Sequence, residues 1–408
     1  MPRGDGGSEL YAPPPLRTVA RVDTTTSAGA ARNLPDDTRF DTVLVLDYGS
    51  QYTPLIARRI REAGVYSEIV PWDLSRDRLR ELALKGIVLS GSDASVHDEN
   101  APRLPAWLLE LDLPVLGICY GLQLVAHTLG GSVGRGERRE YGPAELEIVD
   151  AEHPLFAGCP QSSRVWMSHG DKVLEAPADF RQIARTDGSE VAALSRDAIT
   201  LIQFHPEVNH TESGRQILRN FVVDICGCRP DWNAGSFVDG TVGAIREQVA
   251  DAGMLLGISG GVDSAVAAAL VHAAVGDRLR CIFVDTGLLR ANEVAEVEES
   301  LRTGTGLNLV TVDAADRFLD KLKGVADPER KREIIGDEFF AVFIEEAAKL
   351  DGIEFFVQGT IYPDTIESGS AGLGSVKIKT HHNTRIPDRL HLKVIEPLRR
   401  LFKDEVRE

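Results

Sequence analysis

The chain has 408 residues, enough for two or three domains, and 43% of them are hydrophobic, which supports large buried cores. Its formal net charge of −17 provides no basic field for a phosphate polymer, so we expect no nucleic-acid partner. Five cysteines in a chain of this length do not make a disulfide framework. No apolar run reaches the roughly 18 residues of a membrane-spanning helix, and we expect a cytoplasmic protein without a membrane partner.

Residues 1–39 are rich in Gly, Pro, Thr and Ala and show little apolar periodicity, so we expect a disordered extension there. From "DTVLVLDYG" (41–49) onward, apolar strand-like runs alternate with helical patterns. "KGIVLSGS" (85–92) and "AITLIQF" (198–204) are two such runs. This alternation is typical of a mostly parallel sheet with helices on its faces.

The segment "GCRPDWNAGSF" (227–237) has the Gly, Pro and Asn content of a linker, and a second alternation begins after it with "MLLGIS" (254–259). We therefore predict an α/β protein with two doubly wound, mostly parallel-sheet domains in tandem. Their expected bounds are 40–228 and 237–408, with the linker at 229–236.

A single cysteine, Cys119, lies between the strand-like run "LPVLGI" (113–118) and the helical pattern "YGLQLVAHTLGG" (120–131). On such a strand-to-helix turn, the first N–H groups and the dipole of the helix favour a thiolate. Gly117 and Gly121 would allow a sharp turn and a close approach of substrate. The pattern favours a nucleophile. The alternative is a structural thiol, since free cysteines are among the most buried residues.

The stretch "QFHPEV" (203–208) offers a base for this thiol. It follows a strand-like run, and alternate residues of a strand point to the same side, so His205 and Glu207 are expected to project together. A carboxylate that holds an imidazole, which in turn activates a thiol, is the arrangement of a catalytic triad. H-x-E by itself also describes a structural surface pair, but together with Cys119 it predicts nucleophilic catalysis.

The pattern G-x-C-x-G-x-Q at 117–123, followed by H-P-E at 205–207, resembles the class I glutamine amidotransferases. The resemblance implies a flavodoxin-like domain in which Cys119 attacks the side-chain amide of glutamine and forms a glutamyl thioester. It also implies that His205 passes a proton to the departing ammonia and that Glu207 orients His205. "MSHGDK" (167–172) is similar to the loop that grips the glutamine backbone, with an ordinary polar turn as the alternative. The glutamine-binding residues implied in this way are Gln123, Ser168, His169, Gly170 and Asp171.

The oxyanion hole of this family uses the backbone N–H of the second glycine in a G-G-P loop and that of the residue after the cysteine, here Tyr120. This chain has Gly91-Ser92-Asp93 at the loop. Ser92 still offers an N–H. If the position requires a positive φ, a residue other than glycine is strained by roughly 1–2 kcal/mol, and a misplaced donor lowers the rate about 10²–10³-fold. We therefore expect weakened glutaminase activity that Ser92→Gly would raise.

The stretch "LLGISGGVDSAVAAALVHAA" (255–274) combines an apolar strand, a Gly-rich turn and an Ala-rich helix, which together make an anion nest. It matches neither a Walker A loop nor a Rossmann loop. S-G-G-x-D-S instead resembles the pyrophosphate-binding loop of the N-type ATP pyrophosphatases, with a plain glycine-rich turn as the alternative. The implied phosphate-binding residues are Ser259, Gly260, Gly261, Val262, Asp263 and Ser264. Asp263 is also the expected Mg²⁺ ligand, because magnesium usually takes one or two carboxylates plus phosphate oxygens.

Three further stretches are expected to lie near this loop. Asp285 and Arg290 in "VDTGLLR" follow the next strand, where open α/β sheets place their ligands. Asp364 in "QGTIYPD" is a candidate second metal or phosphate contact. "IKTHHN" (378–383) is a candidate mobile lid with Lys379 and His381 near the phosphates, although a solvated basic stretch is an equal alternative.

Many stretches in one order resemble the glutamine-hydrolysing GMP synthetases, and the resemblance runs almost continuously from about residue 41 to the C-terminus. The matching stretches are "LDYGSQYTPLIARRIRE", "CYGLQ", "WMSHGDKV", "QFHPEV", "SGGVDS", "VDTGLLR", "QGTIYPD" and "IEPLRRLFKDEVR". The resemblance implies glutamine, ATP and XMP as substrates and Mg²⁺ as cofactor. It implies that XMP is adenylated with release of pyrophosphate and that ammonia from glutamine then displaces AMP, giving GMP.

Members of that family continue beyond "FKDEVR" into a C-terminal dimerisation domain that supplies part of the XMP site, whereas this chain ends at Glu408. We therefore expect the domain that forms the family's homodimer to be missing and the chain alone to make little GMP. Two alternatives stay open. One is a partial enzyme or a nucleotide-binding regulatory protein, and the other is a related PP-loop amidotransferase-ligase with a different acceptor.

Overall fold

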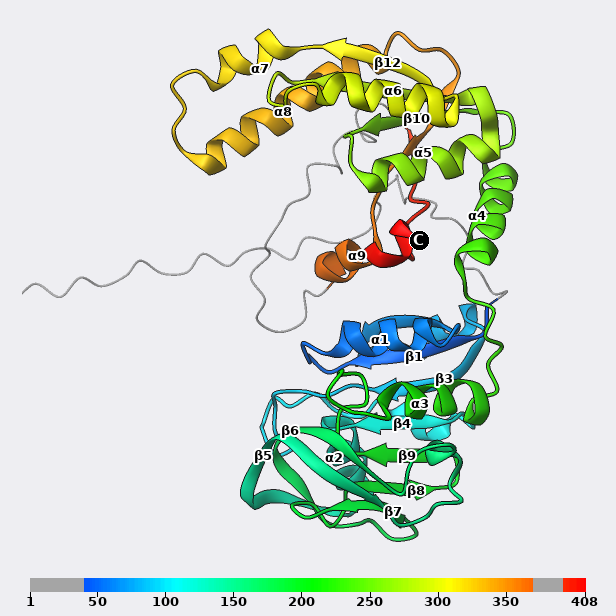
Figure 1. Ribbon diagram of the computed structural model, residues 1–408, viewed down its shortest axis with the longest axis vertical. Coiled ribbons are helices and arrows are strands. Elements are labelled where there is room, and N and C mark those ends of the chain that lie inside the picture. Colours follow the sequence, from blue (N-terminus) through cyan, green and yellow to red (C-terminus); the bar gives the residue numbers. More distant parts are fainter. Residues whose placement is uncertain (1–39, 370–391) are drawn as a thin grey trace, which may run out of the picture.

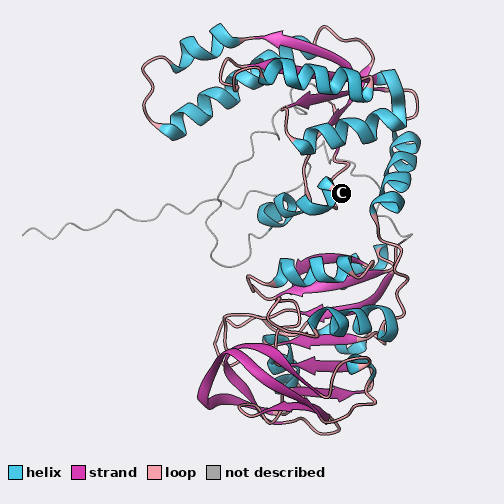
Figure 2. Cartoon of the chain, in the orientation of Figure 1, coloured by secondary structure: helices cyan, strands magenta, loops and turns pink. Residues whose placement is uncertain are grey.

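The computed structural model describes residues 40–369 and 392–408 (Figure 1). Two β-sheets organise these residues, one with nine strands from the N-terminal part and one with five strands from the C-terminal part. Figure 2 shows helices packed along both sheets. In these two ranges, no helix has both the length and the apolar character needed to cross a membrane. The α/β class expected from the sequence is confirmed.

The nine-stranded sheet has the order β2-β1-β3-β4-β9-β8-β7-β5-β6. Neighbouring strands run parallel from β2 to β9 and antiparallel from β9 to β6. The strands are β1 (Thr42–Asp47), β2 (Tyr66–Pro71), β3 (Leu84–Leu89), β4 (Val115–Ile118), β5 (Ser132–Ile148), β6 (Ser162–Glu175), β7 (Arg181–Thr186), β8 (Ala193–Arg196) and β9 (Ile199–Ile202). The sheet is therefore mixed. Parallel strands, buried on both faces, show as apolar runs, whereas the long β5 and β6 carry many polar residues and were not recognised as strands.

Helix α1 (Thr53–Glu62) illustrates how the first sheet is covered. It carries Pro54 in its first turn, where the missing N–H costs no hydrogen bond, and it buries Ile56 and Ile60 against the apolar residues of β1. The other helical segments of this part are α2 (Tyr120–Thr128), α3 (Gly214–Arg219), the 3₁₀ segments η1 (Arg76–Glu81), η2 (Ala106–Glu110) and η3 (Pro154–Phe156), and the π-helical η4 (Asn220–Ile225).

The five-stranded sheet has the order β12-β11-β10-β13-β14, and all its described strands are parallel. Its strands are β10 (Gly253–Ile258), β11 (Leu279–Asp285), β12 (Asn308–Asp313), β13 (Ile353–Val357) and β14 (Lys393–Ile395). Its helices are α4 (Ala234–Val249), α5 (Val262–Val275), η5 (Gly276–Arg278), α6 (Glu293–Thr305), α7 (Ala315–Leu322), α8 (Pro328–Ala347), α9 (Tyr362–Gly369) and α11 (Lys403–Arg407). Because the strands are parallel, the loops that follow β10, β11 and β13 meet at one edge of the sheet.

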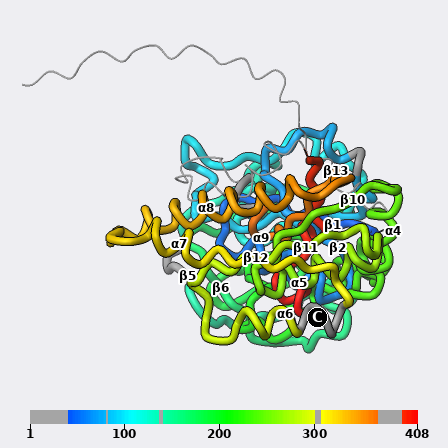
Figure 3. Tube along the Cα trace, turned by 90° about the horizontal axis from the view of Figure 1, so that it is seen from above, coloured from blue at the N-terminus to red at the C-terminus, as the bar shows by residue number. Residues whose placement is uncertain are grey.

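Helices cover both faces of this second sheet. In β10, Leu256 and Ile258 pack in a core with residues of α5, whereas Leu255 packs in a second core with Phe340 and Phe343 of α8. Figure 3 shows α8 on one side of these strands and α5 and α6 on the other. The doubly wound arrangement predicted for the second part of the chain is confirmed.

Arg61 of α1 joins the two parts of the chain. Its guanidinium donates to the carbonyl of Arg400 at 2.5 Å, to the carboxylate of Glu405 at 2.8 Å and to the carbonyl of Ser67 at 2.8 Å. The group lies within 5.5 Å of the ring centroids of four aromatic residues, which are Tyr66, Trp232, Tyr362 and Phe402. Arg400 and Glu405 near the C-terminus therefore pack against helix α1 of the first sheet.

Candidate active sites

Cys119 lies on the turn between β4 and α2 and adopts a backbone conformation that is rare for a side-chain-bearing residue. Its φ is 51° and its ψ is −102°. The turn is held by hydrogen bonds from its N–H to the carbonyl of Ile202 at 2.8 Å and from the N–H of Gln123 to its carbonyl at 3.2 Å. Strained residues of this kind persist where the surrounding structure determines them, often at functional sites. The turn places the sulfur at the edge of the sheet, at the start of a helix.

The two glycines that flank Cys119 serve packing rather than turning. Neither Gly117 nor Gly121 has a positive φ, whereas Cys119 itself does. A Cβ on Gly117 would lie 2.7 Å from Leu201, and a Cβ on Gly121 would lie 2.7 Å from the carbonyl oxygen of Leu89. The expectation that these glycines provide the sharp turn was therefore wrong. They let α2 and its neighbouring strands approach closely.

His205 and Glu207 lie beside each other in the loop that follows β9. Nδ1 of His205 is 2.6 Å from Oε1 of Glu207, and both residues are buried. The strand ends at Ile202, so the strand alternation assumed from the sequence does not apply, and a turn brings the two side chains together. Two hydrogen bonds fix the loop. The N–H of His205 donates to the carbonyl of Trp166, and the Thr211 hydroxyl donates to the carbonyl of His205.

The electrostatics of His205 favour its protonated form. Burial works to lower the pKa of His205, but the carboxylate of Glu207, which is hydrogen-bonded to the ring, and the nearby Cys119 outweigh it, so the pKa stands well above its usual value. A protonated imidazole between a carboxylate and a sulfur stabilises a thiolate nucleophile. The outer side of the imidazole is covered by the ring of Tyr52, whose centroid is 5.4 Å away.

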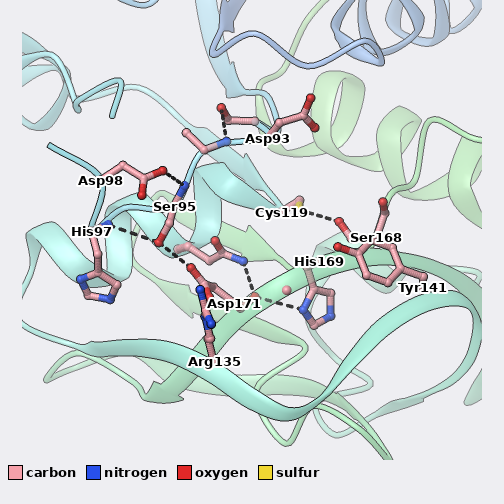
Figure 4. Close-up of a pocket in the computed structure, with 14 residues that line it drawn as sticks. Asp93, Ser95, His97, Asp98, Cys119, Arg135, Tyr141, Ser168, His169 and Asp171 are labelled. Atoms are coloured by element: carbon pink, nitrogen blue, oxygen red, sulfur yellow. Dashed lines mark hydrogen bonds between the residues drawn. The ribbon is translucent and has the colours of Figure 1, made fainter. Parts of the chain in front are cut away.

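A cavity of about 630 Å³ opens beside Cys119 (Figure 4). It is lined by Ser92, Asp93, Ala94, Ser95, His97, Asp98, Cys119, Gln123, Arg135, Tyr141, Ser168, His169, Gly170 and Asp171. All five residues expected to bind glutamine thus lie in one wall. Residues 168–171 belong to strand β6 and not to a loop or a polar turn as expected. Sγ of Cys119 is 3.7 Å from the carbonyl of Ser168, and Nε2 of Gln123 donates to the carbonyl of Asp171 at 2.6 Å.

Ser92 lines the same cavity without the strain expected for a residue in a glycine position. Among the described residues other than glycine, positive φ values occur at five positions, and Ser92 is none of them. Its hydroxyl accepts a hydrogen bond from the N–H of Ala94 at 3.2 Å. Ser92 therefore carries no positive-φ strain that would weaken an oxyanion hole. Next to it, a Cβ on Gly91 would lie 3.6 Å from Cε1 of His205, so this loop borders the imidazole of His205.

The loop between β10 and α5 has the geometry of a compact phosphate-binding turn. Gly260 has a φ of 77°, and the Ser259 hydroxyl accepts from the N–H of Gly261 at 3.3 Å. The hydroxyl of Ser264 donates to the carbonyl of Gly261 at 2.9 Å. The helix that follows has 14 residues, so its N-terminal N–H groups and dipole are available to an anion at the turn. Val262 begins that helix.

The other residues expected near this loop have differing surroundings. Both carboxylate oxygens of Asp263 pair with Nζ of Lys403, at 2.6 and 2.5 Å. Asp285 ends β11 and accepts from the N–H of Gly287, and Asp364 accepts from the N–H of Ile361. The N–H of Arg290 donates to Glu293 in the loop after β11. The candidate lid residues Lys379 and His381 lie outside the described residues.

Sequence reasoning overlooked three residues that border these sites. Lys403 approaches Asp263 from the far end of the chain, Tyr52 covers His205, and Glu140 of β5 lies 3.0 Å from the imidazole of His169. Each contact joins segments distant in sequence. Lys403 and Tyr52 stand in stretches that matched the family pattern, which is the one signal that could have drawn attention to them.

Two family models and several known proteins are similar to this chain. The family model described as glutamine amidotransferase class-I matches residues 44–225, and that described as NAD synthase matches residues 237–297. A glutamine-hydrolyzing GMP synthase of Thermomicrobium roseum is 54% identical over 376 residues, which are 91% of this chain and 71% of that protein. A GMP synthase of Symbiobacterium thermophilum is 52% identical over 90% of this chain and 72% of its own length. The solved structure of a glutamine amidotransferase from Thermotoga maritima is 20% identical, covers 46% of this chain and 98% of that one, and has a TM-score of 0.39.

The fold, the cysteine site and the two matching family models define a class I glutamine amidotransferase unit joined to a unit of the NAD synthase type. About half of all positions are identical to curated GMP synthases over nine-tenths of this chain. The chain therefore belongs to the family of glutamine-hydrolysing GMP synthases.

Proposed function

We propose that this chain hydrolyses glutamine at Cys119 and uses the ammonia to convert XMP into GMP at the expense of ATP. The observation that carries the proposal is the arrangement of Cys119, His205 and Glu207 beside a cavity, in one chain with the phosphate-binding turn after β10. The substrates come from the family, whose named members are glutamine-hydrolysing GMP synthases. We place the activity in the cytoplasm, with no nucleic-acid partner.

In the first half-reaction, Sγ of Cys119 attacks the side-chain amide carbon of glutamine. The negative charge on the amide oxygen would be held by the backbone N–H groups of Ser92 and Tyr120, which flank the turn. His205 gives its proton to the departing nitrogen, and the C–N bond breaks to release ammonia and leave a glutamyl thioester. His205 then takes a proton from water, which attacks the thioester and frees glutamate and the thiol. Glu207 holds the imidazole through Nδ1 during both steps.

In the second half-reaction, the turn at 259–264 would hold the β- and γ-phosphates of ATP against the N-terminus of α5. The 2-oxygen of XMP attacks the α-phosphate, and pyrophosphate leaves. Ammonia then replaces AMP on the purine. The ammonia must reach this site unprotonated, and a path shielded from water keeps it so.

Mg²⁺ is the cofactor that this chemistry implies. Among the described residues, no group of three or more His, Cys, Asp or Glu side chains is arranged to hold a metal ion. The residues fit a magnesium ion bound mostly by phosphate oxygens, since Asp263 stands in the first turn of α5 with its carboxylate 29% exposed. Asp263 would hold the ion, with Asp364 as a second candidate. The ion would neutralise charge on the leaving pyrophosphate.

The direct test is GMP formation by the purified chain from XMP, ATP and Mg²⁺, run in parallel with glutamine and with an ammonium salt. The proposal predicts GMP with both nitrogen donors, whereas the expectation drawn from the family's C-terminal domain is that the chain alone makes little GMP with either donor. GMP with ammonium alone would remove the glutaminase half of the proposal. Nicotinic acid adenine dinucleotide in place of XMP provides the control for the acceptor, and faster amidation of that compound than of XMP would contradict the proposal.

A further inference from the structure

His169, in the wall of the cavity, has a hydrogen-bond acceptor facing each of its two ring nitrogens. Nδ1 is 3.0 Å from the carbonyl oxygen of Asp171, and Nε2 is 3.0 Å from Oε2 of Glu140. A carbonyl can only accept, so Nδ1 carries a hydrogen. Nε2 makes no hydrogen bond in the structure, so the Glu140 carboxylate acts on this edge of the ring through contact and charge.

Glu140 is held in place by elements other than the strand it belongs to. Its carboxylate accepts a hydrogen bond from the hydroxyl of Ser189 at 2.5 Å, and its side chain is 15% exposed. Gly188, beside that serine, leaves the room for it, because a Cβ there would overlap the carboxylate. The turn between β7 and β8 therefore fixes the group that faces His169.

The pair stands where the β5–β6 ladder is irregular. Glu140 is the direct partner of His169, and the next pairing joins Arg135 to Asp171, with a register shift between the two. His169 links β5 to the carbonyl of Asp171, which also accepts from Gln123 on helix α2. At this register shift, the contact between Glu140 and His169 adds a side-chain link that helps to fix residues 168–171 relative to Cys119.

The charge of the pair also matters to the catalytic histidine. The groups that face His169 are Glu140 from β5, the Asp171 carbonyl from β6 and His205 from the loop after β9. Burial lowers the pKa of His169, Glu140 and the Asp171 carbonyl oppose that effect, and the charge of His205 adds to it. The pKa of His169 is lowered overall, so a neutral His169 adds no second cation near the protonated His205.

We propose that Glu140 is a positioning residue for the glutaminase reaction, which contacts the imidazole of His169 and so fixes the β6 wall that receives glutamine. This inference rests on the proposed function. It adds a residue that touches neither the glutamine amide nor the thiol, and it predicts an effect on glutamine binding rather than on the chemistry at Cys119.

The test compares Glu140→Ala, Glu140→Gln and the control Glu145→Gln. Glu145 lies on the same strand and pairs with the Ser162 hydroxyl at the surface. We expect Glu140→Ala to raise the KM for glutamine roughly 10–100-fold, while kcat at saturation and ammonia-dependent GMP formation change less than about threefold. Glu140→Gln can donate an amide hydrogen to Nε2, so it should rescue the KM at neutral pH. Glu145→Gln should behave as the wild type.

A diazoketone analogue of glutamine, which alkylates the thiol, separates the two claims. If it labels Cys119 in neither the wild type nor the variants, the proposed glutaminase function fails. If it labels the wild type and Glu140→Ala with equal apparent affinity, the inference about Glu140 fails and the glutaminase stands. If Glu140→Ala does not fold, a KM for glutamine in Glu140→Gln more than about threefold above that of the wild type would overturn the inference.

Discussion

Arg61 offers the sharpest test of how the two parts of the chain are held together. Its side chain is 2% exposed and its partner Glu405 is 18% exposed, so Arg61→Ala would leave a largely buried carboxylate without its guanidinium. Breaking a buried ion pair by removing one partner costs about 3–5 kcal/mol. For a cooperative unit of this size, each kcal/mol lowers Tm by about 2–4 °C, so the unit that contains the contact should melt about 6–20 °C earlier.

Arg58 provides the control on the same helix. It pairs with Asp404 of α11 at 3.2 Å, but the two side chains are 40% and 56% exposed. Exposed pairs contribute about 0–1 kcal/mol, so Arg58→Ala should change little. Calorimetry of both variants gives the comparison, and limited proteolysis shows whether the C-terminal residues of Arg61→Ala are released. Equal Tm values for the two variants would refute the reasoning that Arg61 joins the two parts.

Three further predictions concern the cysteine site. Glu207→Gln should lower kcat for glutamine hydrolysis about 10³–10⁴-fold, because the imidazole of His205 loses the carboxylate that sets its tautomer, and a loss below tenfold would contradict this role. Because the pKa of His205 is raised in the folded chain, its contribution to stability is complete below about pH 6.5 and is lost as the pH rises through the raised value. Urea unfolding at about pH 6 and pH 9 should therefore show an alkaline loss of stability in the wild type that is smaller in Glu207→Gln. Equal losses in the two proteins would exclude this contribution of His205. Gly121→Ala should cost about 1–3 kcal/mol in the same assay because its Cβ would overlap the backbone of Leu89, and unchanged stability would show that the turn adapts.

Local sequence patterns predicted the structure correctly where a candidate site is built from consecutive residues. The strand–turn–helix at Cys119 and the one at 259–264 each lie within a single short stretch, and both are present as expected. His205 and Glu207 were paired for the wrong reason, since a turn and not a strand brings them together. The predicted contact is nevertheless present, because two residues only two positions apart stay near each other in a strand or in a turn.

The parts that sequence reasoning missed depend on contacts between distant segments. The antiparallel half of the first sheet follows from pairing between long, partly polar strands, which leave no buried apolar run to recognise. Glu140 reaches His169 only because of the β5–β6 register, and Lys403 reaches Asp263 across 140 positions of sequence. No local sequence pattern predicts either of these two contacts. The strain expected at Ser92 was wrong because backbone dihedral angles at a loop depend on its packing.

The most direct test of the central claim is GMP formation by Cys119→Ala, with glutamine and with an ammonium salt as alternative nitrogen donors. Cys119 supplies the atom that attacks glutamine in the proposed hydrolysis, and the turn at 259–264 belongs to a different sheet. The account predicts that the variant makes no GMP from glutamine and keeps the wild-type rate with ammonium. Glutamine-dependent GMP formation by Cys119→Ala at the wild-type rate would contradict the account.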